Sequence, residues 1–319
     1  MATTTPSVPA ATDPAPVPSP STPLPTRWMR VALLVNVVVQ VLIVVTGGLV
    51  RLTGSGLGCP TWPECVPGSY TPTVEQAEGF HKYIEFGNRL LTGVVGLAAL
   101  AALVVAVLLV RRGRPRGLLV LGALPLVLTV VQAVLGGITV LTGLHPATVA
   151  AHFLVSMCLI AVSVLLLQRL QQPDGPVRSV VPREVLLLGA ALAVVAAVVL
   201  VLGTVVTGAG PHSGDADEPA RFALDPRTIS WLHADSVLLF VGLVVGLVVA
   251  LRVTHAPERA RRRAGWLLGV TLAQGLVGYV QYATDLPEAL VLAHMLGACL
   301  LVVTLTLALS ALRERAHRS

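Results

Sequence analysis

The sequence contains eight long runs of apolar residues, each about long enough to cross a lipid bilayer as a helix. A helix of about 20 apolar residues spans the roughly 30 Å of hydrocarbon in a membrane. Backbone polar groups in hydrocarbon need partners within the protein, so these long runs of Val, Leu and Ala predict helices rather than strands. We predict an all-α integral membrane protein whose eight transmembrane helices lie near 31–50, 84–110, 118–141, 146–168, 185–207, 230–251, 265–283 and 288–311.

The composition agrees with this prediction. Hydrophobic residues make up 55% of the chain and charged residues only 12%, a balance that excludes an ordinary soluble domain. The formal net charge of +6 comes largely from short basic segments between the apolar runs, such as RRGRPR at 111–116 and RRR at 261–263. Their position beside the bilayer explains them through attraction to anionic lipid, without a nucleic acid as partner.

The basic residues also predict the orientation in the membrane. All but five of the 22 Lys and Arg lie near the N-terminus, in the linkers after the second, fourth and sixth apolar runs, or in the C-terminal tail. The five others are Arg51, Lys82, Arg89, Arg221 and Arg227. Cytoplasmic segments carry the excess of basic residues, so we expect a multi-pass plasma-membrane protein with both termini in the cytoplasm.

Both ends of the chain differ in composition from the apolar runs. Residues 1–26 are rich in Pro, Thr and Ala and lack the basic and then apolar layout of a cleaved signal peptide. We expect them to form a disordered cytoplasmic tail. Residues 313–319 form a short basic tail.

The chain repeats itself. The segment from Gln132 to His152 aligns without a gap with the segment from Gln274 to His294, and eight of the 21 positions are identical. The alignment predicts two four-helix halves, residues 27–170 and 185–312, joined by a cytoplasmic linker at 171–184. Each half has an even number of spans, so the repeat is a parallel one. Such four-helix bundles hold cofactors between facing helices.

The second span of each half aligns less firmly. The segment at 85–97 matches the segment at 231–243 and places either Gly87 or Asn88 opposite His233. The register is open by that single residue.

Three histidines lie inside the apolar runs at about one depth, close to the extracytoplasmic ends: His152, His233 and His294. Polar groups in a membrane are costly to bury, and they mark functional sites. Imidazole is a common axial ligand of haem iron. A single histidine is better explained by packing, but a pair at matched depth, with one member repeated in the other half, favours haem ligation. His233 and His294 form such a pair in the second half.

Two opposite charges open the second apolar run, at Glu85 and Arg89, with His81 one helical turn before them. The first interpretation is an ion pair that lowers the cost of two buried charges. The second is a functional carboxylate. The residues alone favour the ion pair.

The four cysteines fall into two groups. Cys59 and Cys65 lie in the Pro-rich loop that follows the first run, on the oxidising side of the membrane, where a disulfide between them is expected. Cys158 and Cys299 lie within apolar runs and are interpreted as packing residues.

Taken together, these motifs resemble the haem A synthases of aerobic respiratory chains. The resemblance rests on GGLVRLTGSGLGCPTWPEC at 47–65, on IEFGNR at 84–89, and on the single histidines of spans 4, 6 and 8. It implies an enzyme that oxidises the C8 methyl group of haem O to a formyl group. It also implies haem B, bound by His233 and His294, in the C-terminal half, and the substrate haem O in the N-terminal half.

The resemblance assigns roles in the N-terminal half as well. Glu85 would be a catalytic carboxylate that handles protons at the methyl group, and Arg89 would hold a haem propionate through its paired N–H donors. His152 would be the ligand of iron in this half. The family pattern Glu-x-x-His-Arg reads Glu-Phe-Gly-Asn-Arg here, and an amide at Asn88 is a poor iron ligand. His81 would serve as a second ligand only if the helix shifts or unwinds.

Other functions fit part of the pattern. A dihaem cytochrome b that takes electrons from quinol would explain the paired histidines, and a non-catalytic haem carrier would need the same ligands. A transporter would explain the repeat, but it predicts helices broken near the middle of the membrane. The electron donor stays open, since the sequence has no nucleotide-binding glycine motif. We expect contact with haem O synthase or with the terminal oxidase.

Overall fold

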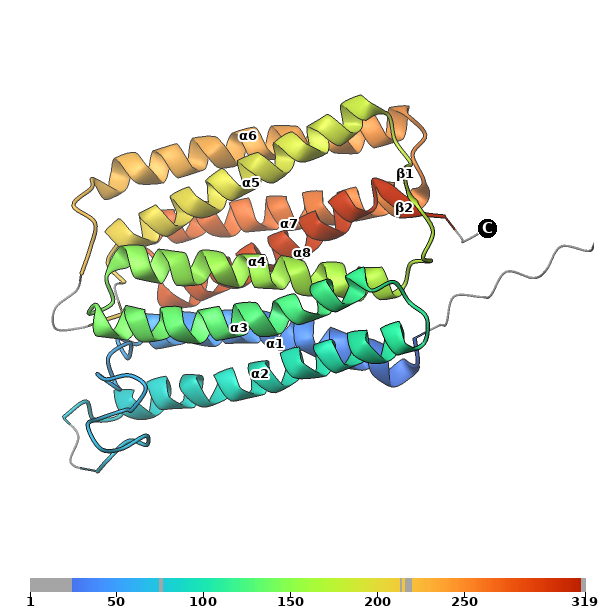
Figure 1. Cartoon of the computed structure of the whole chain (residues 1–319). Helices are drawn as coiled ribbons and strands as arrows, with labels where there is room; N and C mark the ends of the chain where they lie inside the picture. Colours follow the sequence, from blue (N-terminus) through green and yellow to red (C-terminus); the bar gives the residue numbers. More distant parts are fainter. Residues whose placement is uncertain (1–24, 75–76, 213, 216–219, 317–319) are drawn as a thin grey trace, which may run out of the picture.

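The computed structural model describes residues 25–74, 77–212, 214–215 and 220–316, and in them the chain forms eight long helices (Figure 1). They are α1 (Arg27–Leu52), α2 (His81–Arg111), α3 (Gly117–Leu141), α4 (Pro146–Leu170), α5 (Arg183–Ala209), α6 (Pro226–Val253), α7 (Glu258–Ala283) and α8 (Glu288–Ser310). Each coincides with one predicted apolar run. The predicted tail at 1–26 lies almost wholly outside the described residues, as do residues 317–319.

Helix α7 departs most from its predicted range. It begins at Glu258, several residues before the apolar run, because Glu, Ala and Arg favour helix and extend it beyond the apolar segment. Among the described residues, seven helices are long and apolar enough to cross a membrane, and α7 is the remaining one. Its C-terminal half carries polar side chains, Gln274 and Gln281 among them, which lower its hydropathy.

The helices pack as two groups that follow the repeat. Helices α1 to α4 pack in chain order and close through contacts between α1 and α4, where Asn36 Nδ2 donates to Ser163 Oγ at 3.0 Å. Helices α5 to α8 also pack in chain order, with a smaller contact between α5 and α8. The two groups meet where α8 packs on α1 and α4, and where α5 packs on α4. Buried side chains fill this junction: Val44, Met157, Ile160, Cys299 and Val302.

The repeat is visible in the backbone of two turns. Leu144, between α3 and α4, and Leu286, between α7 and α8, both have positive φ angles, of 55° and 59°. Leu144 N–H donates to Thr139 O at 2.9 Å, and Leu286 N–H donates to Gln281 O at 2.8 Å. The turns therefore share one backbone conformation, although Gly143 precedes the first leucine and Asp285 the second.

The structure adds two short strands to the predicted all-α fold. Strand β1 (Val177–Ser179) pairs antiparallel with β2 (Arg313–Arg315), with Arg178 opposite Glu314. The linker between the halves is thus hydrogen-bonded to the segment after α8. Strands of three residues carry too few positions for a period-2 pattern, which is why the sequence did not predict them.

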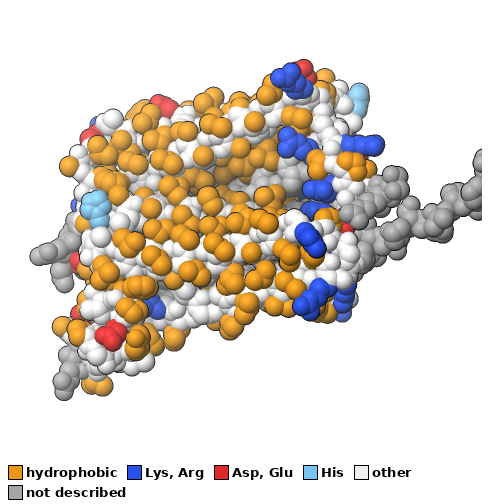
Figure 2. All heavy atoms as spheres, in the orientation of Figure 1, with side chains coloured by type: hydrophobic (Ala, Val, Ile, Leu, Met, Phe, Trp, Pro, Cys, Tyr) orange, Lys and Arg blue, Asp and Glu red, His pale blue; other side chains and the backbone are white. Residues whose placement is uncertain are grey.

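The two ends of the bundle differ in charge. Figure 2 shows Lys and Arg side chains gathered at the end where β1 and β2 lie, while apolar side chains cover the length of the helices. Helix α1 begins at this same end (Figure 1). By the positive-inside rule this arginine-rich end remains our prediction for the cytoplasmic side.

Candidate functional site

Helix α8 presents His294 toward α7. A β-carbon added to Gly278 of α7 would lie 3.2 Å from His294 Cε1, so the glycine gives the imidazole its space. Gln274 Nε2, one turn earlier on α7, donates to the backbone oxygen of His294 at 2.8 Å. His294 Nδ1 is buried and has no hydrogen-bond partner among the described residues. The backbone of His294 is thus held by Gln274, while the buried Nδ1 makes no hydrogen bond to the described residues.

The N-terminal half repeats this arrangement at His152. A β-carbon on Gly136 of α3 would lie 3.4 Å from His152 Cε1, and Gln132 Nε2 donates to His152 O at 3.0 Å. The same amide also contacts Ser156 Oγ. Within the described part of the chain, His152 Nδ1 is likewise buried without a hydrogen-bond partner. The match extends the sequence repeat to side-chain geometry.

The third histidine, His233, lies on α6 and faces α5. A β-carbon on Gly203 would meet His233 Cε1 at 3.2 Å, and His233 Nδ1 is also buried and unpaired within the described residues. The carboxylate of Asp225 caps this helix by accepting from the backbone N–H of Thr228 at 2.9 Å. Hydrogen bonding from Thr228 lowers the pKa of this carboxyl group. His233 on α6 and His294 on α8 thus belong to the same half, and each lies beside a glycine of a neighbouring helix.

These imidazoles fit haem better than a bare metal ion. No group of three or more His, Cys, Asp or Glu in the described residues is arranged to hold a metal ion. Haem iron needs only one or two protein ligands, because the porphyrin supplies the others. The C-terminal half contains two candidate haem ligands, His233 and His294, and the N-terminal half contains one, His152.

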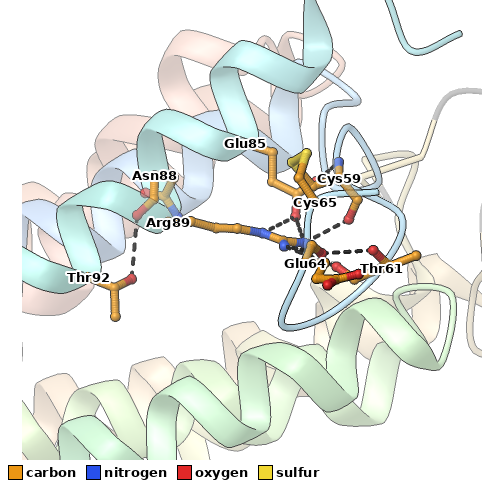
Figure 3. A network of polar contacts seen from close by, with 8 residues as sticks. All are labelled: Cys59, Thr61, Glu64, Cys65, Glu85, Asn88, Arg89 and Thr92. Atoms are coloured by element: carbon orange, nitrogen blue, oxygen red, sulfur yellow. Dashed lines mark hydrogen bonds and ion pairs between the residues drawn. A yellow bond between two sulfur atoms is a disulfide. The ribbon is translucent and has the colours of Figure 1, made fainter. Parts of the chain in front are cut away.

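Glu85 and Arg89 form the ion pair that the sequence predicted (Figure 3). Glu85 Oε1 accepts from Arg89 Nε at 3.0 Å and from Nη2 at 2.7 Å. Glu85 Oε2 accepts from the backbone N–H of Cys59 at 2.6 Å. Only 6% of Glu85 is exposed, so the carboxylate lies between helix α2 and the loop that follows α1.

Arg89 is directed at the same loop. Beyond Glu85, its guanidinium donates to the backbone oxygens of Cys59 at 2.7 Å, Thr61 at 3.0 Å and Glu64 at 3.2 Å (Figure 3). A guanidinium group has five N–H donors, and the bonds to Glu85 and to the loop together use all of them. A haem propionate would have to displace one of these partners to reach Arg89.

The loop covers the end of the N-terminal half that lies opposite the arginine-rich end. Cys59 and Cys65 are joined by a disulfide with a Cα–Cα distance of 4.3 Å, and both are fully buried. The loop backbone lies against the start of α2, since a β-carbon on Gly58 would approach His81 O to 2.4 Å. Trp62 packs on α3, where a β-carbon on Gly137 would come within 2.4 Å of its ring. The ion pair therefore fixes a loop that closes this half.

Asn88 and His81 occupy different surroundings. Asn88 Oδ1 accepts from Thr46 Oγ1 of α1 at 2.8 Å, so it links two helices. His81 is the first residue of α2 and is exposed, and its Nδ1 lies 2.8 Å from Ser55 Oγ. Helix α2 is continuous from His81 to Arg111. The shift or unwinding that His81 would need to act as an iron ligand is absent from this described helix.

Sequence reasoning missed the contacts that position these residues. The repeat aligns Gln132 with Gln274 and Gly136 with Gly278. These identical residues were the only sign of the contacts in the sequence. His212, in the loop after α5, has its Nε2 at 3.0 Å from Leu286 O. Two hydrogen bonds near this end of the bundle join the two halves: Arg51 Nη2 donates to Thr207 O at 3.0 Å, and Gly56 N–H donates to Gly214 O at 2.9 Å.

Comparison with known proteins agrees with this geometry. Residues 30–216 match the protein family described as "Cytochrome oxidase assembly protein". The chain is 36% identical over 146 residues to the "Heme A synthase" of Lysinibacillus sphaericus, covering 44% of this chain and 43% of that protein. It is 34% identical over 140 residues to the "Heme A synthase" of Geobacillus kaustophilus, covering 43% and 42%. These matches span less than half the length of either relative. Because the family match extends over more than half of the chain, the protein belongs to the cytochrome oxidase assembly protein family.

Proposed function

We propose that the protein is a haem A synthase, an oxidoreductase that converts the C8 methyl group of haem O to a formyl group and so produces haem A. The observation that carries the proposal is the unequal set of ligands in two otherwise repeated halves. One half has histidines in its second and fourth spans, His233 and His294, whereas the other half has His152 in its fourth span and an asparagine in its second. The matched relatives bear the name of this enzyme.

The two halves then have different tasks. A haem B held between His233 and His294 would supply one-electron transfer, because two imidazole ligands leave no free position on iron. His152 would hold the substrate haem O in the N-terminal half, where the disulfide loop limits access of water from the outer side. All eight helices, α7 included, would cross the membrane, with both termini cytoplasmic and the haem sites toward the extracytoplasmic side.

The chemistry requires two oxidations of one carbon atom. Two successive hydroxylations convert the methyl group to an alcohol and then to a geminal diol, which loses water to leave the formyl group. Each hydroxylation removes two electrons from the carbon atom. If water supplies the oxygen atom, an external acceptor takes these electrons and two protons are released; if dioxygen supplies it, dioxygen takes them together with two further electrons and two protons and its second atom leaves as water. Glu85 is the proposed proton acceptor. Each carboxylate oxygen can accept more than one hydrogen bond, so its contacts with Arg89 and Cys59 leave capacity for a substrate proton.

A non-catalytic haem carrier is a second candidate, favoured by one observation. The hydrogen bonds of Glu85 and Arg89 go to each other or to the backbone of the loop, as expected of residues that only hold the loop in place. Product analysis distinguishes the two candidates. Membranes containing the protein together with a source of haem O should yield haem A or its hydroxylated precursor on extraction. Haem O alone, from folded protein that carries haem, would favour the carrier.

A further inference from the structure

A cavity of about 240 Å³ lies at the arginine-rich end of the bundle, where the two halves meet. Helices α3 and α4 contribute one wall, and the end of α8 with β2 contributes the other. The wall formed by Leu121 and Leu165 is apolar, and Leu165 is 40% exposed on the lipid-facing surface of α4. The remaining wall carries hydrogen-bond donors, one apolar residue and one carboxylate: Gln168, Arg169, Gln172, Val177, Ser310, Arg313, Glu314 and Arg315.

The charges beside this cavity are not balanced. Arg114 Nε lies 2.8 Å from Asp174 Oδ2, and Arg169 is paired with the other oxygen of the same carboxylate. Arg315 is close by, and its Nη1 donates to Gly175 O at 3.3 Å. The pKa of Arg315 is held below its usual value by burial and by repulsion from Arg169, against a smaller attraction from Asp174. Arg313 and Glu314 also line the cavity, so four arginines (Arg114, Arg169, Arg313 and Arg315) lie at this end beside two carboxylates, those of Asp174 and Glu314.

A further arginine stands behind the wall of the cavity. Arg263 is buried, and it donates to Leu307 O at 3.1 Å, to Ser310 Oγ at 3.2 Å and to Gln168 Oε1. Gln168 Oε1 also accepts from Arg259 Nη2 at 3.0 Å. In the part of the chain that the structure describes, no carboxylate forms an ion pair with Arg263. A buried cation without a counter-ion is costly, so an anion in the adjacent cavity would stabilise this region.

We propose that this cavity binds the phosphate headgroup of an anionic glycerophospholipid from the adjacent leaflet. Guanidinium groups bind phosphate through paired N–H donors, and basic pockets between membrane helices suit such headgroups. The apolar wall at Leu121 and Leu165 gives the acyl chains a path from the headgroup into the bilayer. Arg169 belongs to the N-terminal half and Arg313 and Arg315 follow α8, so one lipid would bridge the two halves. The site is independent of the proposed haem chemistry.

Native mass spectrometry of the full-length protein tests this proposal. The protein is released from nanodiscs containing equal amounts of phosphatidylglycerol and phosphatidylcholine, and the lipids that remain bound are counted. The test variant combines Arg313→Gln with Arg315→Gln, and Arg313→Gln alone is a milder version, because the Arg313 side chain is exposed. Arg252→Gln is the matched control, since Arg252 is an exposed arginine on α6 that does not line the cavity.

The wild type and the control should retain phosphatidylglycerol in preference to phosphatidylcholine. The double variant should lose about tenfold or more in phosphatidylglycerol affinity, because each guanidinium–phosphate hydrogen bond contributes roughly that factor. Equal retention by the double variant and the control would overturn the proposal. Displacement of the lipid by inorganic phosphate, but not by sodium chloride at the same ionic strength, would also overturn it by assigning the cavity to free phosphate.

Discussion

The side-chain amide of Gln274 donates a hydrogen bond to the backbone oxygen of His294 at 2.8 Å, and this contact joins α7 to α8 at the depth of the candidate haem ligand. Gln132 makes the same contact with His152 at 3.0 Å in the other half. The shared contact indicates that the repeat preserves the position of a histidine relative to the neighbouring helix, in addition to the histidine itself.

Replacing Gln274 with Leu removes this hydrogen bond and keeps most of the side-chain volume. We expect the variant to lose about 1 kcal/mol of stability, and we expect a shift in the midpoint potential of the haem in the C-terminal half. Redox titration of the purified protein checks the shift. Gln132→Leu is the matched change in the other half, and it should leave that potential unaltered. A potential unchanged in Gln274→Leu would show that the amide does not position His294.

Gly278→Ala tests the space beside His294. The new β-carbon would lie 3.2 Å from His294 Cε1, so the ring must move by a few tenths of an ångström. The absorption spectrum of the C-terminal haem should shift and less haem should be retained. Gly275→Ala, on the same helix, places its β-carbon in open space and should behave like the wild type. Identical spectra for the two variants would contradict the assignment.

The histidine pair can be tested through bound haem. His294→Ala and His233→Ala should each lose most of the haem B, because either change removes one of two axial ligands. His255 is an exposed histidine at the opposite end of the bundle with φ of 51°, and His255→Asn tolerates that backbone conformation. This control should retain haem at the wild-type level in a pyridine haemochrome assay. Full haem retention in His294→Ala would exclude it as a ligand.

Glu85→Gln separates catalysis from loop anchoring. The amide keeps one oxygen that can accept from Cys59 or Arg89, but it carries no charge and is a poor proton acceptor. We expect haem B to stay bound and formyl production to fall by at least about a hundredfold, the usual contribution of a general base. Glu288→Gln, an exposed change in the first turn of α8, is the control. Retained activity in Glu85→Gln would assign the carboxylate to anchoring alone.

Asn88→His tests why the N-terminal half carries an amide in its second span. The change removes the acceptor of the Thr46 hydrogen bond and places an imidazole in the second span of the same half as His152. We expect electron paramagnetic resonance to show more low-spin iron in this half, because a second strong ligand would coordinate it. A wild-type protein that is already fully low-spin there would contradict an open position on the substrate iron.

Much of the fold could be predicted from the sequence, because the bilayer fixes the length of each apolar run. The corresponding positions of His152 on α4 and His294 on α8 could be predicted as well, since the repeat aligns them. The start of α7 could not, because Arg259 and its basic neighbours extend a helix that hydropathy does not detect. The pairing of β1 with β2 escaped prediction because strands of three residues show no periodicity.

The site was predicted less completely, for a physical reason. The spacing of Glu85 and Arg89 predicts their ion pair, because residues four apart face each other on a helix. Their hydrogen bonds to Cys59 and Thr61 depend on how the preceding loop folds back over α2. The spacing of residues along the sequence does not predict the path of that loop. The same limit applies to Gln274, whose partner lies on the next helix.

The central claim is that this protein oxidises the methyl group of haem O. The most direct measurement is mass spectrometry of haem extracted over time from purified protein that has been loaded with haem O and supplied with electrons and dioxygen. The account predicts first the hydroxylated haem and then haem A, both missing from His294→Ala. Haem O that remains unchanged in folded protein with haem B bound, alongside an active haem A synthase control, would contradict it.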